Sequence, residues 1–288
     1  MPSVVIVLAL AAALGFAGAS VLQQQAAAST PTGRAGGIGL LVRLLGRPRW
    51  LAGVAADGVA YLLQVLALDS GPLALVQPLL AGGLLFALLF NVSKGGKGMR
   101  ASDWGAAAVS AAGLALFIIV GAPKGSAQGP DDPAWVGFSL ATAVGVGVAV
   151  LLARKRSPSS RAALLAVGAG VAFALSAALT KQTLAEFHRG LGHMLTTGYP
   201  YALIVSAIVG MTLVQSAFQA GPLAASLPTL TLTEPIFATV AGSILFGEHL
   251  RGGLAGVIAV LGAAVAGGAV VYLTQSPSAQ PLLEAAKT

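Results

Sequence analysis

The sequence predicts an all-α polytopic membrane protein with about nine transmembrane helices (eight to ten), arranged as two inverted four-helix repeats plus one linking helix. The first observation behind this prediction is composition. Hydrophobic residues make up 56% of the chain and charged residues 9%, so too few charges are present to cover a soluble core, which carries about 25% charged residues. The second is that the apolar residues form long runs separated by short polar loops. The third is a duplicated apolar segment, described below.

Lipid is therefore expected to be the main solvent, and the bilayer the main partner. The net charge of +7 does not indicate nucleic acid, because the basic residues lie in short loops between apolar runs. The chain has no cysteine, which excludes disulfides, zinc–thiolate sites and thiol catalysis.

The first predicted span is Ser3 to Leu22, long enough for a hydrocarbon core of about 30 Å. It is expected to be retained rather than cleaved as a signal peptide, because no Lys or Arg precedes its apolar run. A polar connector follows, and within it residues 31–49 form either an interfacial amphipathic piece or a short tenth helix. The second span begins at Trp50, an interfacial anchor, and ends at Leu68.

The remaining spans are separated by Gly-, Pro- or charge-rich turns. Asp69-Ser-Gly-Pro leads into the third span, and a connector with Glu186, His188, Arg189 and His193 leads into the seventh. The predicted limits of spans three to nine are Leu73–Phe90, Trp104–Gly121, Trp135–Ala153, Ala162–Thr180, Pro200–Phe218, Leu223–Phe246 and Leu254–Leu273.

Basic residues predict the sidedness of these spans. The loops after spans one, three and five, with the tail, hold 12 Lys and Arg residues, whereas the opposite side holds 4. Because cytoplasmic loops are enriched in Lys and Arg, the N-terminus is expected outside and the C-terminus in the cytoplasm, in a cell inner (plasma) membrane.

Internal repetition organises the chain. Gly71-Pro72 and Pro78 recur 150 residues later as Gly221-Pro222 and Pro228, and the segment from Phe16 resembles the one from Phe173. Spans one to four thus match spans six to nine, and the single span between them inverts the second unit. The expected units are 1–122 (first repeat), 123–160 (linking helix and basic loop), 161–275 (second repeat) and 276–288 (a disordered cytoplasmic tail).

Short motifs then suggest a family. Leu232-Thr-Glu-Pro-Ile-Phe-Ala, followed by Leu245-Phe-Gly-Glu-His-Leu, resembles a recurring segment of the drug/metabolite transporter superfamily with EamA-type repeats. Arg34-Ala-Gly and Ala122-Pro-Lys resemble the NIPA-type magnesium transporter branch, whereas Glu234-Pro235 fits the wider superfamily better. The resemblance covers all nine predicted spans but not the tail. It implies a carrier with a site near the midplane between the repeats.

Glu234 is the leading candidate for function, because an ionisable group in mid-span is expensive and usually functional. Its neighbour Pro235 lacks an N–H and is expected to kink the helix. Thr229 and Thr233 lie four residues apart on one face and add hydroxyls. The alternative for Glu234 is a neutral side chain sealing a helix–helix contact.

Other polar residues are expected to line the same path or to serve packing. Asp57, Tyr61 and Gln64 share one face of the second span, which is either a substrate-lining face or a packing network. Gln77 and Gln215 are further substrate-binding candidates. Hinges are expected at the prolines, although these residues could equally kink helices only to fit the bundle: Pro78, Pro228 and Pro235.

Two further groups are interpreted as structural. Glu248 is expected to pair with a basic neighbour or to cap the next helix, and His188 and His193 lack a third metal ligand nearby. No enzyme motif or nucleotide loop occurs, so no enzymatic activity, cofactor or ATP coupling is expected.

The predicted function is secondary transport of a small solute by alternating access, through a cavity lined by spans two, three, seven and eight. The alternative is magnesium transport, for which Asp57 and Glu234 would supply the two carboxylates well inside spans. Substrate, coupling ion, direction and oligomeric state stay open.

Overall fold

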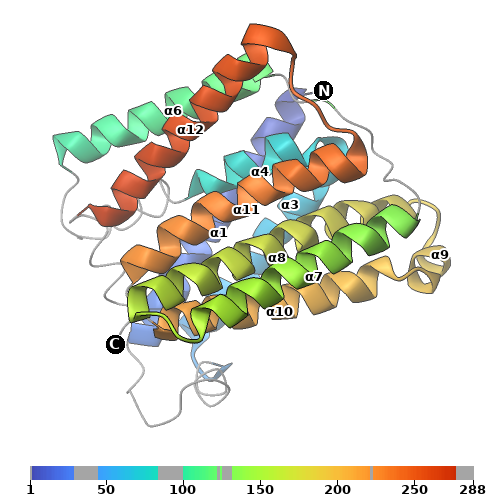
Figure 1. Cartoon of the computed structure of the whole chain (residues 1–288), viewed down its shortest axis with the longest axis horizontal. Coiled ribbons are helices and arrows are strands. Elements are labelled where there is room, and N and C mark those ends of the chain that lie inside the picture. The colour runs from blue at the N-terminus through green and yellow to red at the C-terminus, as the bar shows by residue number, and fades with distance from the viewer. Residues whose placement is uncertain are drawn as a thin grey trace.

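The computed structural model describes residues 2–28, 45–83, 100–121, 124, 132–220 and 223–276. Within these ranges the chain is built from helices, and the β-type pairing seen there is a single bridge between two loops (Figure 1). The helices are α1 (Pro2–Ala28), α3 (Pro48–Ser70), α4 (Leu73–Ala81), α6 (Ala101–Gly121), α7 (Asp132–Ala153), α8 (Pro158–Phe187), α9 (Leu191–Thr196), α10 (Tyr199–Ala220), α11 (Leu223–Phe246) and α12 (Gly253–Gln275).

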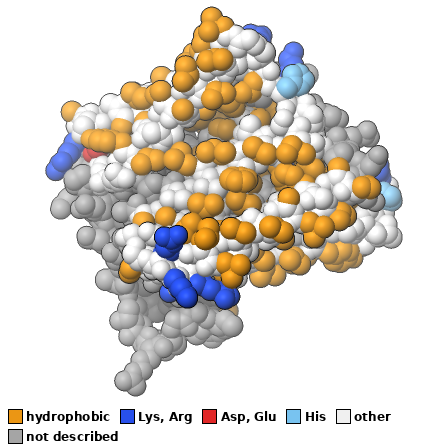
Figure 2. All heavy atoms as spheres, in the orientation of Figure 1, with side chains coloured by type: hydrophobic (Ala, Val, Ile, Leu, Met, Phe, Trp, Pro, Cys, Tyr) orange, Lys and Arg blue, Asp and Glu red, His pale blue; other side chains and the backbone are white. Residues whose placement is uncertain are grey.

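Six helices in the described part of the chain are long and apolar enough to cross a membrane: α3, α6, α7, α8, α11 and α12. Their outward faces carry large apolar side chains, for example Val136, Leu140 and Val144 on α7. Figure 2 shows hydrophobic side chains over most of one face, with the charged groups gathered towards the helix ends. The chain is therefore a multi-pass membrane protein whose surroundings are lipid. Apolar stretches 3–19 and 199–214, in α1 and α10, are shorter.

Predicted and observed limits agree closely for most helices. The eighth predicted span coincides with α11, and the ninth is α12 with one residue added at the start and two at the end. Two limits were wrong: α1 continues to Ala28, and α8 continues to Phe187, so Glu186 lies in a helix rather than in a connector. The third span is described as α4 through Ala81, and residues 84–90 lie outside the described ranges, as do residues 31–44 and the tail from 277.

The turn between α3 and α4 is packed tightly against α1. A Cβ atom at Gly71 would lie 2.5 Å from Val5 Cγ1, so glycine is required for α1 to approach the turn. Pro72 then sits in an extended conformation as the N-cap of α4, whose first amides cannot find partners within the helix. Gly71 and Pro72 thus set where α4 begins and leave its first N–H groups available.

Helix α8 lies at the centre of the packing. Of its most apolar window 72% is buried, against 28% or less for the other five long helices, so α8 is surrounded by protein and the others also face lipid. It packs against α7, α10 and α11, while α1 packs against α3 and α4, and α6 pairs with α12. Small residues allow these approaches: a Cβ at Gly15 would lie 2.9 Å from Ala60 Cβ, and one at Gly210 would lie 2.7 Å from Phe173.

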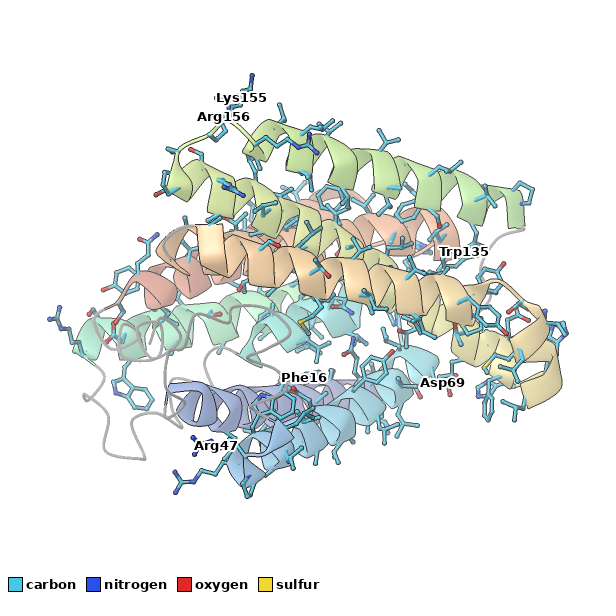
Figure 3. All side chains as sticks on the ribbon, turned by 90° about the horizontal axis from the view of Figure 1, so that it is seen from below. Phe16, Arg47, Asp69, Trp135, Lys155 and Arg156 are labelled. Atoms are coloured by element: carbon cyan, nitrogen blue, oxygen red, sulfur yellow. The ribbon has the colours of Figure 1, made fainter. Side chains whose placement is uncertain are left out.

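Charged residues separate towards the two ends of the helices. In Figure 3, Arg47, Lys155 and Arg156 lie towards one end, and Asp69 and Trp135 towards the other. At the second end, the loop after α6 pairs with the loop after α11: Lys124 and His249 exchange two backbone hydrogen bonds, of 3.1 and 2.8 Å. We call the first end the arginine end and the second the tryptophan end.

Candidate functional site

Glu234 lies at the middle of α11 and is only partly buried. The Glu234 backbone nitrogen packs against α8, because a Cβ atom added at Gly170 of α8 would lie 3.0 Å from this nitrogen. No hydrogen bond or ion pair to the Glu234 carboxylate is seen among the described residues. A carboxylate at this depth is costly unless it finds a partner or water, so the position of Glu234 keeps the functional interpretation open.

The two threonines before Glu234 are bonded within their own helix. Thr229 Oγ1 donates to the Ala225 carbonyl and Thr233 Oγ1 to the Thr229 carbonyl, both at 2.7 Å. Thr233 is buried, and its Cβ would lie 2.8 Å from a Cβ at Gly170, which places it in the α8–α11 contact. Both hydroxyls can still accept a hydrogen bond, but their protons are already used.

The predicted polar face of α3 is directed in part towards α8. The Tyr61 hydroxyl and Thr180 Oγ1 are 3.0 Å apart, although the Tyr61 side chain is also exposed. Asp57 and Gln64, on the same face, are partly buried. The structure therefore brings Tyr61 together with a partner on α8 that the sequence analysis did not identify.

Gln77 is buried on α4, with 2% of its surface exposed. Its Nε2 atom has no hydrogen-bond partner within the described part of the chain, and Pro78 follows inside the same helix. An unpartnered buried amide is unusual, because leaving such a donor unsatisfied is costly. Gln77 thus resembles Glu234: a polar group inside the bundle without a protein partner. The side chains of Gln215 and Pro228 lie outside the described residues.

The best-satisfied polar site lies at the tryptophan end and centres on Glu248, whose side chain is fully buried. Its Oε1 atom accepts hydrogen bonds from Leu73 N at 2.8 Å and Lys181 Nζ at 2.7 Å. Its Oε2 atom accepts one from Ala74 N at 2.9 Å. The carboxylate therefore caps the N-terminus of α4 and pairs with α8 at once. We call Glu248, Lys181 and the two α4 amides the carboxylate clasp.

This arrangement offsets the cost of burying both charges. The first amides of a helix lack intrahelical partners and carry a partial positive charge, which favours an anion there. An ammonium group adds a charge-assisted bond to the same carboxylate. A buried pair with its bonds satisfied is stable in place, but removing one partner leaves an unpaired charge that costs about 3–5 kcal/mol.

Aromatic rings enclose the clasp. The Lys181 ammonium lies 4.5 Å from the centre of the Phe246 ring, a cation–π contact. Trp135 meets Phe246 edge-on at 5.8 Å and Tyr199 at 5.4 Å between ring centres. These rings come from the N-terminal ends of α7 and α10 and the C-terminal end of α11, so five helices meet around the clasp.

The prediction for Glu248 was right in kind and wrong in its partners. Glu248 pairs with a base and caps a helix, but that base is Lys181 rather than a neighbour in sequence, and the capped helix is α4 rather than the next one. Sequence reasoning missed Lys181 because it assigned this residue to a loop. The sequence signal that could have found Lys181 is that the helical pattern of α8 continues beyond Thr180.

A second polar cluster lies nearby at the end of α8. Glu186 is buried and accepts hydrogen bonds from Gln182 at 2.8 Å and Arg189 at 3.1 Å, and its carboxylate lies 2.9 Å from His193 Nε2. His188 lies 3.6 Å from Asp69 at the end of α3. The two histidines therefore contact different acids, and the described residues hold no group of three potential ligands for a metal ion.

The predicted central cavity stays a prediction. A hollow of about 360 Å³ is found instead on the outer side of α12, lined by Arg251 and apolar residues including Val257 and Leu261. It lies away from the helices that carry Glu234 and Gln77, and its apolar lining suits lipid.

Comparison with known proteins identifies a relative of this chain but no activity. No family model matches the chain, and no solved structure matches it. A Corynebacterium glutamicum protein, named as the uncharacterized protein Cgl0250/cg0304, is 30% identical over 247 residues, which cover 85% of this chain and 86% of that protein. The chain therefore belongs to the same family of membrane proteins as Cgl0250/cg0304 of C. glutamicum.

Proposed function

We propose that this protein is a secondary transporter that moves a small solute across the membrane by alternating access. The observation that carries the proposal is Glu234: a carboxylate in the middle of a membrane-spanning helix, partly accessible and without a protein partner among the described residues. By contrast, Glu186 and Glu248, two buried acids at the tryptophan end, each accept hydrogen bonds from several donors. A group left without donors is suited to a proton, an ion or a substrate.

Helix packing supports the inverted repeat on which this mechanism depends. Helix α1 packs against α3 and α4, and α8 packs in the same way against α10 and α11. Two of the pairs that join the units, α4 with α11 and α6 with α12, each match a helix with its own counterpart, and α3 also contacts α8. This is the contact pattern expected for two related units around a pseudo-two-fold axis, with α7 as the linking helix.

The site would lie between α3, α4, α10 and α11. Gln77 supports this location, because its buried amide lies on α4, which packs against α11. Tyr61 on α3 and the Thr229–Thr233 face of α11 would add hydrogen-bonding groups. Membership of the drug/metabolite transporter superfamily, with Pro78, Pro228 and Pro235 as hinges, is part of the same proposal.

The test is a ligand screen by thermal shift on the purified protein, using metabolites, organic cations and Mg²⁺. We expect a solute that raises the melting temperature of the wild type and of an Asp69→Asn control at the end of α3. Glu234→Gln should abolish that shift and abolish uptake into proteoliposomes while leaving the fold intact. An equal ligand response in Glu234→Gln would reject the role of this residue.

The same screen separates the two possible substrate classes. A response to Mg²⁺ that requires both Asp57 and Glu234 would favour the cation transporter, because Mg²⁺ binds carboxylate oxygens and keeps several waters. A response to an organic solute, insensitive to Mg²⁺, would favour the metabolite carrier.

A further inference from the structure

The carboxylate clasp joins parts of the chain that are far apart in sequence. Glu248 is separated by 175 residues from Leu73 and by 67 from Lys181. In the proposed repeats, α4 belongs to the first unit, and α8 and α11 to the second. The clasp is thus a polar contact between the two units, placed at the tryptophan end of the α4–α11 interface.

The clasp also lies over the proposed site. On α4, Gln77 follows Leu73 by four residues and therefore lies one turn inward on the same face. On α11, Glu234 precedes Phe246 by 12 residues, or about 18 Å along the helix. A solute moving between α4 and α11 towards the tryptophan end would meet the clasp before leaving the protein.

The segment that carries Glu248 is built as a short strap. Helix α11 ends at Phe246, and the strap is bounded by Gly247 and Gly253, which have positive φ angles of 59° and 66°. Its backbone is bonded to the loop after α6: His249 pairs with Lys124, and Arg251 N donates to the Gly121 carbonyl at 2.9 Å. Motion of the α6–α12 pair would therefore be transmitted to the carboxylate.

We propose that the carboxylate clasp is the gate at the tryptophan end of the transport path, closed when Glu248 holds Lys181 and the N-terminus of α4. This inference rests on the proposed function. Opening separates the Glu248 carboxylate from Leu73 N, Ala74 N and Lys181 Nζ together, and glycines 247 and 253 absorb the change in backbone angle. Water then replaces the protein donors at the carboxylate.

Absence of cysteine in the chain allows a direct test. Ala238 lies one turn inward from Gly242 on α11 and is fully buried, and a cysteine there adds one sulfur atom to the side chain. We expect Ala238→Cys to react slowly with a membrane-impermeant maleimide from the tryptophan end. Adding Lys181→Met, which removes the charge and keeps the apolar stem, should raise this rate about tenfold or more, because a charge-assisted bond that favours the closed state is lost. Lys181→Arg should restore the slow rate.

Two reference cysteines control the measurement. Gly192→Cys on α9 is exposed at the same end and should react equally fast in every background. Ala169→Cys is buried on α8 in a separate apolar cluster and should stay slow. If Lys181→Met folds poorly, Glu248→Gln, which keeps the side-chain shape, takes its place. An unchanged Ala238→Cys rate, or an equal rise at Ala169→Cys, overturns the gate.

The labelling experiment involves no substrate, so its failure is distinct from failure of the proposed function. If the maleimide reaction of Ala238→Cys stays slow in every clasp variant, the gate proposal is rejected, even where Glu234→Gln still abolishes ligand binding. A faster rate supports the gate independently of which solute is found.

Discussion

Acidic side chains inside this bundle differ in how completely they are satisfied. Glu248 accepts two backbone N–H groups and an ammonium, and Glu186 contacts Gln182, Arg189 and His193. Both lie near the tryptophan end, where helix termini and polar side chains supply donors. Glu234 lies in the middle of α11, far from any helix terminus, and the described neighbours offer it none. Protein donors therefore hold Glu248 and Glu186 in place, whereas none of the described residues holds the Glu234 carboxylate.

Gly242 has no side chain and therefore leaves room for the Glu248 carboxylate in the clasp. A Cβ atom there would collide with Glu248 Oε2 and lie 2.8 Å from Glu248 Cδ, so Gly242→Ala must displace the carboxylate from α4. We expect this variant to lose about 1–3 kcal/mol of stability, the usual cost of overpacking. Thermal unfolding in detergent would measure it. Gly145→Ala on α7, where a Cβ meets open space, is the control and should be neutral or slightly stabilising. Equal melting temperatures for the two variants would contradict the packing argument.

At the scale of helices, hydropathy located most boundaries but not the C-terminal ends of α1 and α8. The apolar run ends at Thr180, and Lys181, Gln182 and Glu186 would ordinarily indicate a loop. Lys181 pairs with Glu248 in the segment after α11, and Gln182 donates to Glu186 one turn further along α8. Because these polar groups are satisfied, the helix continues through them at little cost. Hydropathy also could not identify the partners of Glu248, because a pairing across 175 residues leaves no local pattern in the sequence. Position and type of each candidate residue were readable from the sequence, whereas contacts such as Tyr61–Thr180 were not.

The α6–α12 pair depends on two facing glycines. A Cβ at Gly113 would lie 2.5 Å from the Gly262 carbonyl oxygen, and one at Gly262 would lie 2.9 Å from the Gly113 oxygen. Between lipid-exposed helices, such close approach supplies the packing contacts that hydrophobicity cannot. Gly113→Ala should therefore lower the melting temperature and separate the pair. Gly105→Ala on the same helix meets open space and should not. A distance between spin labels on α6 and α12 would report the separation, and an unchanged distance with unchanged stability would refute the contact.

At the scale of the whole molecule, the distribution of positive charges agrees with the membrane sidedness predicted from the order of the helices. The exposed residues Arg47 and Arg100 and the run 154–156 precede or follow helices that begin or end at the arginine end, and the exposed Arg49 lies in the first turn of α3. The tryptophan end has fewer bases, and one of them, Lys181, is neutralised within the clasp. Because the positive-inside rule counts accessible Lys and Arg in short loops, the burial of Lys181 increases the asymmetry. The arginine end is therefore expected to face the cytoplasm.

Cysteine labelling in intact cells would decide this orientation, since the natural chain contributes no background thiol. Lys155→Cys, in the exposed turn between α7 and α8, should resist an impermeant maleimide until the cells are opened. Gly192→Cys, exposed on α9 at the other end, should be labelled at once. A Cβ atom at Gly192 meets open space, and Lys155 is exposed, so both variants should fold. Immediate labelling of Lys155→Cys with protection of Gly192→Cys would place the arginine end outside. The proposed gate at Glu248 would then open to the cytoplasm rather than to the outside.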